Sequence, residues 1–137
     1  MKNILVLCTG NSCRSQMAQG YLQQFAGDKA AVYSAGVEIH GLNPFAVGIM
    51  AEDSVDISKH TSNHVDEYAN IDFDYVITVC DHANESCPVF MGKTKKLHHN
   101  FTDPSKKSGT AKELVETFRA TRDEIKSFCR EFARENL

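Results

Sequence analysis

A cysteine and an arginine stand at the two ends of a short polar run near the start of the chain, Cys8-Thr9-Gly10-Asn11-Ser12-Cys13-Arg14-Ser15. Arg14 can donate two parallel hydrogen bonds to an oxyanion, and Ser15 can donate its hydroxyl to a sulfur. Backbone N–H groups and the positive end of a helix dipole would bind an anion and lower the pKa of the Cys8 thiol. These residue types predict a Cys8 thiolate that attacks a tetrahedral oxyanion held by residues 9–15.

The segments on either side of this run must hold it as a loop between a strand and a helix. Before it, the apolar run Asn3-Ile4-Leu5-Val6-Leu7 predicts a buried parallel strand. After it come apolar residues at helical spacing and a glycine where a helix would end: Met17, Ala18, Tyr21, Leu22, Phe25 and Gly27. A strand, a glycine-containing loop and a helix start form a nest of N–H groups that suits an oxyanion.

Strands and helices alternate along the rest of the chain. Further strands are predicted over residues 31–34, 74–79 and 95–98. We therefore predict an α/β fold in a single domain, residues 1–137, with a four-stranded parallel sheet flanked by helices.

Two helix starts are recognisable from their capping residues. Asn43-Pro44 pairs an N-cap with a proline at the first helical position, and the helix after it should bury Phe45, Ile49 and Met50. Thr110-Ala111-Lys112-Glu113 is a capping box that opens a long amphipathic helix near the end of the chain.

The carboxyl ends of parallel strands meet at one edge of such a sheet. Cys8 follows the first predicted strand and Cys80 the third, so we expect the two sulfurs to be neighbours. Cys87 stands seven positions after Cys80, and the pair could act as a resolving couple in which one thiol attacks and the other accepts the disulfide. Two other interpretations stay open: inert buried thiols, or a zinc site of Cys80, His82, Cys87 and His98 or His99.

A carboxyl group is predicted at the same edge of the sheet. Phe101-Thr102-Asp103-Pro104 follows the last predicted strand, and Pro104 would fix the local backbone. Asp103 could then protonate a leaving oxygen above the anion site. The alternative is an ordinary Asp-Pro turn.

Bulk composition excludes several classes of protein. The chain of 137 residues is 42% hydrophobic and 24% charged, with a net charge of −3, which argues against a general nucleic-acid binder. We see neither a membrane-spanning run nor a signal-peptide pattern, and expect a cytoplasmic monomer. In that compartment five cysteines suggest redox or metal chemistry sooner than structural disulfides.

Together these residues resemble the thioredoxin-coupled arsenate reductases built on the low-molecular-weight protein tyrosine phosphatase fold. The resemblance covers essentially the whole chain and implies arsenical detoxification. It rests on the following segments: residues 8–18, Tyr33-Ser34-Ala35-Gly36, residues 56–62, residues 76–80 with Cys87-Pro88, and Asp103-Pro104.

The resemblance also implies a mechanism. Cys8 attacks arsenate held by the loop amides and the loop arginine, while Asp103 protonates the departing hydroxyl. Cys80 then attacks Cys8, arsenite leaves, and Cys87 attacks Cys80 to leave a Cys80–Cys87 disulfide. Thioredoxin, or alternatively glutaredoxin, would reduce that disulfide. A segment that relays sulfurs must rearrange, so residues 80–92 should differ between the reduced and oxidised forms.

The chain departs from the family at one point. Some members bind potassium behind the loop through an asparagine, a serine, a threonine and two carboxylates. Asn11, Ser34 and Thr61 match, but Gln19 and Asn63 stand where the carboxylates would be. Without those negative charges, we predict that this protein needs no potassium.

Two other functions are compatible with the same residues. One is a phosphatase for phosphotyrosine or small aryl phosphates, with Cys80 and Cys87 as a redox guard. The other is a non-catalytic sensor of oxyanions or redox state, which the general acid Asp103 disfavours because a sensor needs none.

Overall fold

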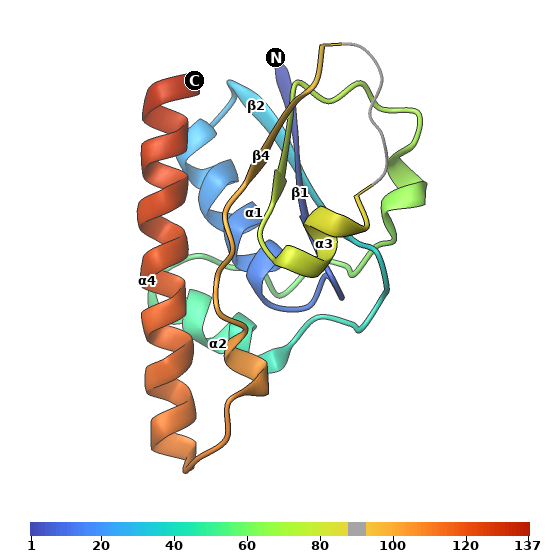
Figure 1. The fold of residues 1–137 in the computed structure, drawn as a ribbon. Coiled ribbons are helices and arrows are strands. Elements are labelled where there is room, and N and C mark those ends of the chain that lie inside the picture. The colour runs from blue at the N-terminus through green and yellow to red at the C-terminus, as the bar shows by residue number, and fades with distance from the viewer. Residues whose placement is uncertain (88–92) are drawn as a thin grey trace.

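A parallel sheet forms the centre of the computed structural model, which describes residues 1–87 and 93–137 (Figure 1). Within these ranges the strands lie in the order β2-β1-β3-β4, and their bounds are β1 (Lys2–Cys8), β2 (Ala30–Gly36), β3 (Tyr75–Thr78) and β4 (Lys95–His98). The helices are α1 (Arg14–Ala26), α2 (Pro44–Glu52), α3 (Asp81–Glu85) and α4 (Ala111–Asn136), with 3-10 turns η1 (Val65–Tyr68) and η2 (Pro104–Lys106). The predicted fold class and parallel four-stranded sheet are confirmed.

Strand β1 occupies the middle of the sheet because its residues are apolar on both faces. It pairs in parallel with β2 and β3, so that Cys8 lies opposite Gly36 and Leu7 lies opposite Thr78. The carboxyl ends of β1, β2 and β3 therefore lie at the same edge. This register brings the segments after the strands together at one place.

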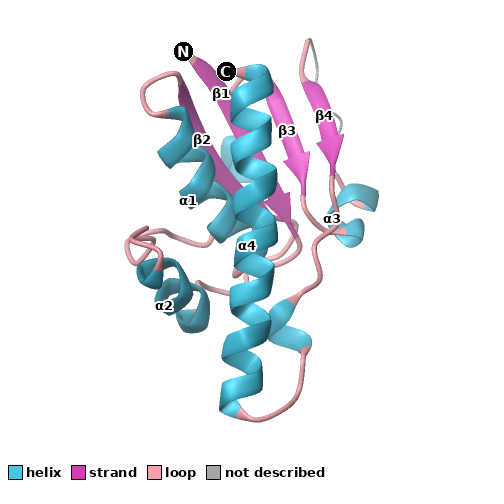
Figure 2. Cartoon of the chain, turned by 90° about the vertical axis from the view of Figure 1, so that its left-hand side faces the viewer, coloured by secondary structure: helices cyan, strands magenta, loops and turns pink. Residues whose placement is uncertain are grey.

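Helices α1 and α4 cover one face of the sheet, as Figures 1 and 2 show from two directions. The amphipathic α4 buries Ile125 and Cys129 completely, and the Cys129 thiol lies 3.7 Å from the Ala18 carbonyl of α1. Helix α3 lies beside the tips of β3 and β4 (Figure 2). No helix in the described part of the chain is both long enough and apolar enough to cross a membrane.

The predicted caps are present. The Asn43 side chain accepts a hydrogen bond from Phe45 N at 2.8 Å, and Thr110 and Glu113 form the reciprocal capping box of α4. Helix α1 ends at Gly27 with φ +58°, a backbone conformation that favours glycine.

The predicted burial of Phe45 is wrong. Ile49 and Met50 are buried as expected, but Phe45 is 47% exposed. Its ring stacks on Phe118 of α4 with centroids 5.5 Å apart. The position near the start of α2 places Phe45 at the edge of the helix–helix contact.

Candidate active site

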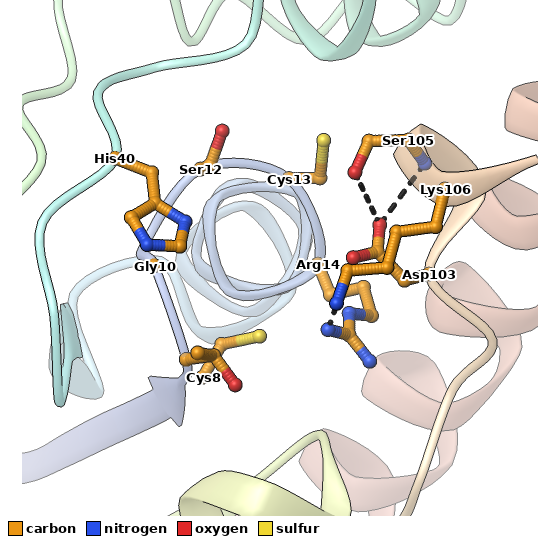
Figure 3. Close-up of a pocket in the computed structure, with 10 residues that line it drawn as sticks. Cys8, Gly10, Ser12, Cys13, Arg14, His40, Asp103, Ser105 and Lys106 are labelled. Carbon is orange, nitrogen blue, oxygen red and sulfur yellow. Dashed lines mark hydrogen bonds and ion pairs between the residues drawn. The ribbon is translucent and has the colours of Figure 1, made fainter.

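The loop between β1 and α1 lines a small cavity of about 110 Å³ at the carboxyl edge of the sheet. Figure 3 shows Cys8 on one side of this cavity and Ser12 with Cys13 on the other. The residues that line it are Cys8, Thr9, Gly10, Ser12, Cys13, Arg14, His40, Asp103, Ser105 and Lys106. Helix α1 starts here without a side-chain cap, so its first N–H groups remain available to an anion.

Asn11 holds the loop from behind. It is completely buried, and its φ of +50° is an uncommon conformation for a residue with a side chain. Its amide donates to the hydroxyls of Ser15 (2.9 Å) and Ser34 (3.0 Å), while its oxygen accepts from Asn63 N (2.7 Å). These bonds stabilise the left-handed turn that aims the neighbouring N–H groups at the cavity.

Ser15 is also buried behind the loop. Its hydroxyl accepts from Asn11, and among the described residues no hydrogen bond joins it to the Cys8 sulfur. The expected donation from Ser15 to Cys8 is therefore not seen in this state of the protein.

Glycine is required where β2 meets the loop. A Cβ atom on Gly36 would lie 2.7 Å from the Thr9 carbonyl oxygen and 2.9 Å from Asn11 N. Both contacts are closer than a side-chain carbon tolerates, and both are to backbone. Only glycine lets the end of β2 support the loop at this distance.

Arg14 and Asp103 form one wall of the cavity (Figure 3). The Arg14 guanidinium donates to the Phe101 carbonyl at 2.9 Å and contacts the Asp103 carboxylate at 3.5 Å. Ser105 donates to Asp103 Oδ1 from its N–H (3.0 Å) and its hydroxyl (2.6 Å). These contacts orient a bidentate cation and a carboxyl group toward the same space.

The predicted meeting of Cys8 and Cys80 is confirmed. Their sulfurs are 3.6 Å apart, and both residues are buried. The Cys80 sulfur also lies 3.1 Å from the Thr9 hydroxyl and 3.4 Å from Ala83 N, because Cys80 is the N-cap of α3. Two thiols and several hydrogen-bond donors thus converge beside the oxyanion cavity.

The predicted lowering of the Cys8 pKa is wrong for this arrangement. The Cys8 thiol donates to Cys80 and is buried, and both effects raise its pKa well above the ordinary value, against the attraction of Arg14. The pKa of Cys80 falls to about 5, since Cys80 accepts from Cys8, Thr9 and Ala83. Cys80 accepts more hydrogen bonds than Cys8 does, and its pKa is therefore the lower of the two.

The other cysteines have different environments. Burial and the nearby Asp103 carboxylate raise the pKa of Cys13 to about 12, so this thiol stays neutral in the loop. Burial also raises the pKa of the half-buried Cys87, while Lys96 beside it acts in the opposite direction. Part of the segment that we predicted to rearrange, residues 80–92, is not described. Residues 88–92, which include Pro88, lie outside the described residues.

The residues behind the loop do not fit a potassium ion. The Ser34 hydroxyl donates to Gln19 Oε1 at 2.6 Å, and the Thr61 hydroxyl donates to Asn63 Oδ1 at 2.6 Å. The amide of Asn11 points an N–H group at Ser34. These polar groups satisfy one another, and Gln19 and Asn63 supply no negative charge that would attract a cation.

A zinc site is likewise not formed by the candidate residues. Within residues 1–87 and 93–137, no group of three or more histidine, cysteine or acidic side chains is arranged to hold a metal ion. His98 instead contacts Asp81 and Thr78, and His99 packs against aromatic rings. The zinc interpretation of Cys80 and Cys87 is therefore not supported.

Three residues that line the cavity were not among the predicted site residues: His40, Ser105 and Lys106. His40 packs over Gly10 and lines the cavity opposite Arg14 (Figure 3), with its Nε2 atom 2.7 Å from a Glu38 carboxylate oxygen. Lys106 lines the cavity next to Asp103. Since His40 closely follows the end of β2, the rule that strand ends converge was the signal that could have found it.

The fold and the loop between β1 and α1 define the class of the protein. Residues 3–137 match the family model described as low molecular weight phosphotyrosine protein phosphatase, and the chain belongs to this family. Within it, the chain is 47% identical to an arsenate reductase of Bacillus subtilis over 132 residues, which is 96% of this chain and 95% of the relative.

Solved structures of arsenate reductases are also similar. One, described as an arsenate reductase in oxidized state, has a TM-score of 0.84 at 29% identity, and the match covers 98% of each chain. Another, in the phosphate binding state, has a TM-score of 0.79 at 30% identity, with the same coverage.

Proposed function

We propose that this chain reduces arsenate to arsenite, with Cys8 as nucleophile and Cys80 as the second redox sulfur. The observation that carries the proposal is the 3.6 Å distance between the two sulfurs beside the oxyanion cavity. A phosphatase needs one cysteine at this place, whereas reduction of a bound oxyanion by a thiol requires a second sulfur within reach of the first. The similarity to arsenate reductases supports the same assignment.

In the first half of the reaction, arsenate is held by the backbone of residues 9–15 and the Arg14 guanidinium. Cys8 passes its proton to the Cys80 thiolate, to which it is already hydrogen-bonded, and its sulfur attacks arsenic. The sulfur–arsenic bond forms as one hydroxyl leaves with a proton from Asp103, which makes water. Arsenic remains in its oxidised state at this point.

In the second half, Cys80 releases its proton to solvent and attacks the Cys8 sulfur. A Cys8–Cys80 bond forms, the sulfur–arsenic bond breaks, and its electron pair stays on arsenic, which leaves as arsenite. Cys87 then loses its proton to solvent and attacks Cys80, which frees Cys8 as a thiolate and produces a Cys80–Cys87 disulfide. An external dithiol protein, thioredoxin or glutaredoxin, returns the two electrons.

A thiol count without any reductant tests this proposal. The protein is fully reduced, freed of reductant under anaerobic conditions and mixed with arsenate, and its disulfides are mapped by mass spectrometry. We expect the loss of two thiols per chain, release of arsenite, and a Cys80–Cys87 bond. Cys87→Ser should stop at Cys8–Cys80, and Cys8→Ser should lose no thiols.

The result also separates reduction from phosphatase chemistry. Asp103, Arg14 and the loop would serve a phosphatase equally well, so an aryl phosphate is assayed in parallel. Unchanged thiols in the wild type, together with hydrolysis of the aryl phosphate, would contradict the reductase and favour a phosphatase. Normal turnover of Cys87→Ser with thioredoxin would contradict the relay alone.

A further inference from the structure

Helix α3, which Cys80 caps, has little apolar contact to hold it in place. It is five residues long and buries only Ala83, while Asp81, His82 and Glu85 are exposed. A helix of this length is not stable without tertiary contacts. The position of the Cys80 sulfur relative to Cys8 therefore depends on the polar contacts of α3 with the rest of the protein.

Thr78 of β3 contacts the Asn84 side chain at 3.5 Å, and three further contacts come from one face of β4 and its extension. Lys96 Nζ donates to the Asn84 carbonyl at 3.4 Å, His98 Nε2 lies 2.8 Å from Asp81 Oδ1, and the Asn100 side chain accepts from Asp81 N at 3.1 Å. Residues 96, 98 and 100 alternate along an extended chain, so their side chains point the same way. We call these three residues the docking stripe.

The other face of β4 has a different role. His99, which lies between two members of the docking stripe, packs against the rings of Phe101 (4.4 Å) and Phe128 (4.9 Å). The alternation thus turns His99 toward Phe128 of α4 and turns the docking stripe toward α3.

His98 is the most firmly placed member of the docking stripe. Its Nδ1 atom lies 2.7 Å from the hydroxyl of Thr78, which is completely buried at the end of β3. If Thr78 donates to Nδ1, the neutral ring carries its proton on Nε2 and donates it to Asp81. Thr78, His98 and Asp81 therefore connect the rigid centre of the sheet to the first residue of α3, directly after Cys80.

We propose that His98 is a positioning residue for Cys80: through Asp81 it fixes the first turn of α3 and so keeps the Cys80 sulfur within reach of Cys8. This inference rests on the proposed function, because only the reductase uses Cys80. His98 lies outside the oxyanion cavity and touches no reacting atom. Its loss should slow the attack of Cys80 on Cys8 without weakening arsenate binding.

The first test is the rate of arsenate-dependent thiol loss in a single turnover of His98→Ala. A displacement of about 1 Å in a reacting group can cost 10²-fold in rate, so we expect the maximal rate constant to fall roughly 10- to 100-fold. The half-saturating arsenate concentration should stay unchanged. A wild-type rate constant, or a fall that comes only from weaker arsenate binding, would overturn the proposal.

Two further variants separate positioning from general damage. His98→Gln keeps an N–H donor for Asp81 and should recover most of the rate, whereas equal slowing of His98→Gln and His98→Ala would contradict the docking role. His82→Ala, on the exposed side of the same helix, is the matched control and should react as the wild type does.

A measurement without arsenate tests the position of Cys80 even if the protein does not reduce arsenate. The ultraviolet absorbance of the Cys80 thiolate is followed against pH in the wild type and in His98→Ala. Displacement of Cys80 would remove its donors Cys8 and Thr9, so its titration should move to higher pH in the variant. An identical titration would overturn the positioning role, while absence of arsenate-dependent thiol loss in the wild type would contradict only the proposed function.

Discussion

The two sulfurs of Cys8 and Cys80 share one proton, and their surroundings decide where it stays. An isolated Cys8 at the end of β1, near Arg14 and the start of α1, would readily form a thiolate. Cys80 has the stronger set of donors, namely the Cys8 thiol, the Thr9 hydroxyl and the Ala83 N–H. Before an oxyanion binds, these contacts therefore favour the thiolate form at Cys80 over the thiolate form at Cys8.

A pH titration of thiolate absorbance checks this assignment at the level of single residues. The wild type should show a step near pH 5, because the pKa of Cys80 is about 5; the thiolate is lost below that pH and present above it. Cys8→Ala removes the donor that lowers this pKa most, so the step should move to higher pH.

Cys129→Ala is the control for that titration. Cys129 is completely buried in α4, which raises its pKa far above the range of the experiment, so its removal should leave the step in place. If instead Cys8→Ala abolished the step without moving it, the low pKa would belong to Cys8.

The start of α1 and the loop before it form a site for an anion. Neutral hydrogen bonds hold this site together. Asn11 bridges the loop to β2 through Ser34 and to the segment before η1 through Asn63. Gln19 of α1 completes the contact by accepting from Ser34. These hydrogen bonds within the protein hold the loop in place.

We therefore expect the thermal stability of the protein not to depend on potassium. The melting temperature should be the same in potassium chloride and sodium chloride of equal ionic strength, because Gln19 and Asn63 are already hydrogen-bonded to Ser34 and Thr61. A clear fall when sodium replaces potassium would contradict this.

A charged variant provides the comparison for the cation experiment. Gln19→Glu with Asn63→Asp places two carboxylates next to the oxygens of Ser34 and Thr61, and their mutual repulsion would be relieved by a cation. The melting temperature of this variant should rise as potassium is added.

For the whole molecule, the site depends on layers that are far from it. Helix α4 packs over α1 (Figure 2). This contact supports the helix whose first residue, Arg14, lines the cavity. The apolar face of α4 is buried at Ile125, Cys129 and Phe132. A defect in this layer should lower the stability of the entire domain rather than change the chemistry alone.

Truncation of Ile125 tests this. Its side chain is completely buried, so Ile125→Ala should lower the free energy of unfolding by about 2–5 kcal/mol, measured by urea denaturation. Glu124→Ala, at the exposed neighbouring position, should change it by no more than about 0.5 kcal/mol. Similar losses for both variants would mean that Ile125 does not contribute as a core residue.

Local signals predicted the elements well because their causes lie within a few residues. Asn43 caps α2 and Thr110 caps α4 through bonds to backbone groups two and three residues away, so the motif contains both partners. The proximity of Cys8 and Cys80 was predictable for a different reason, since parallel strands place their carboxyl ends at one edge. Phe45 was predicted wrongly because its exposure depends on how far Phe118 of another helix covers it.

Residue type, spacing and strand order were enough to predict the parallel sheet, the loop between β1 and α1, and the proximity of Cys8 to Cys80. Which of the two sulfurs has the lower pKa depended on the tertiary structure, since Cys8 and Thr9 reach Cys80 from a distant segment of the chain. The tertiary structure also decided the docking of α3, for His98 meets Asp81 across 17 positions of sequence. Proton affinity and side-chain position depend on distances in space, which no short motif contains.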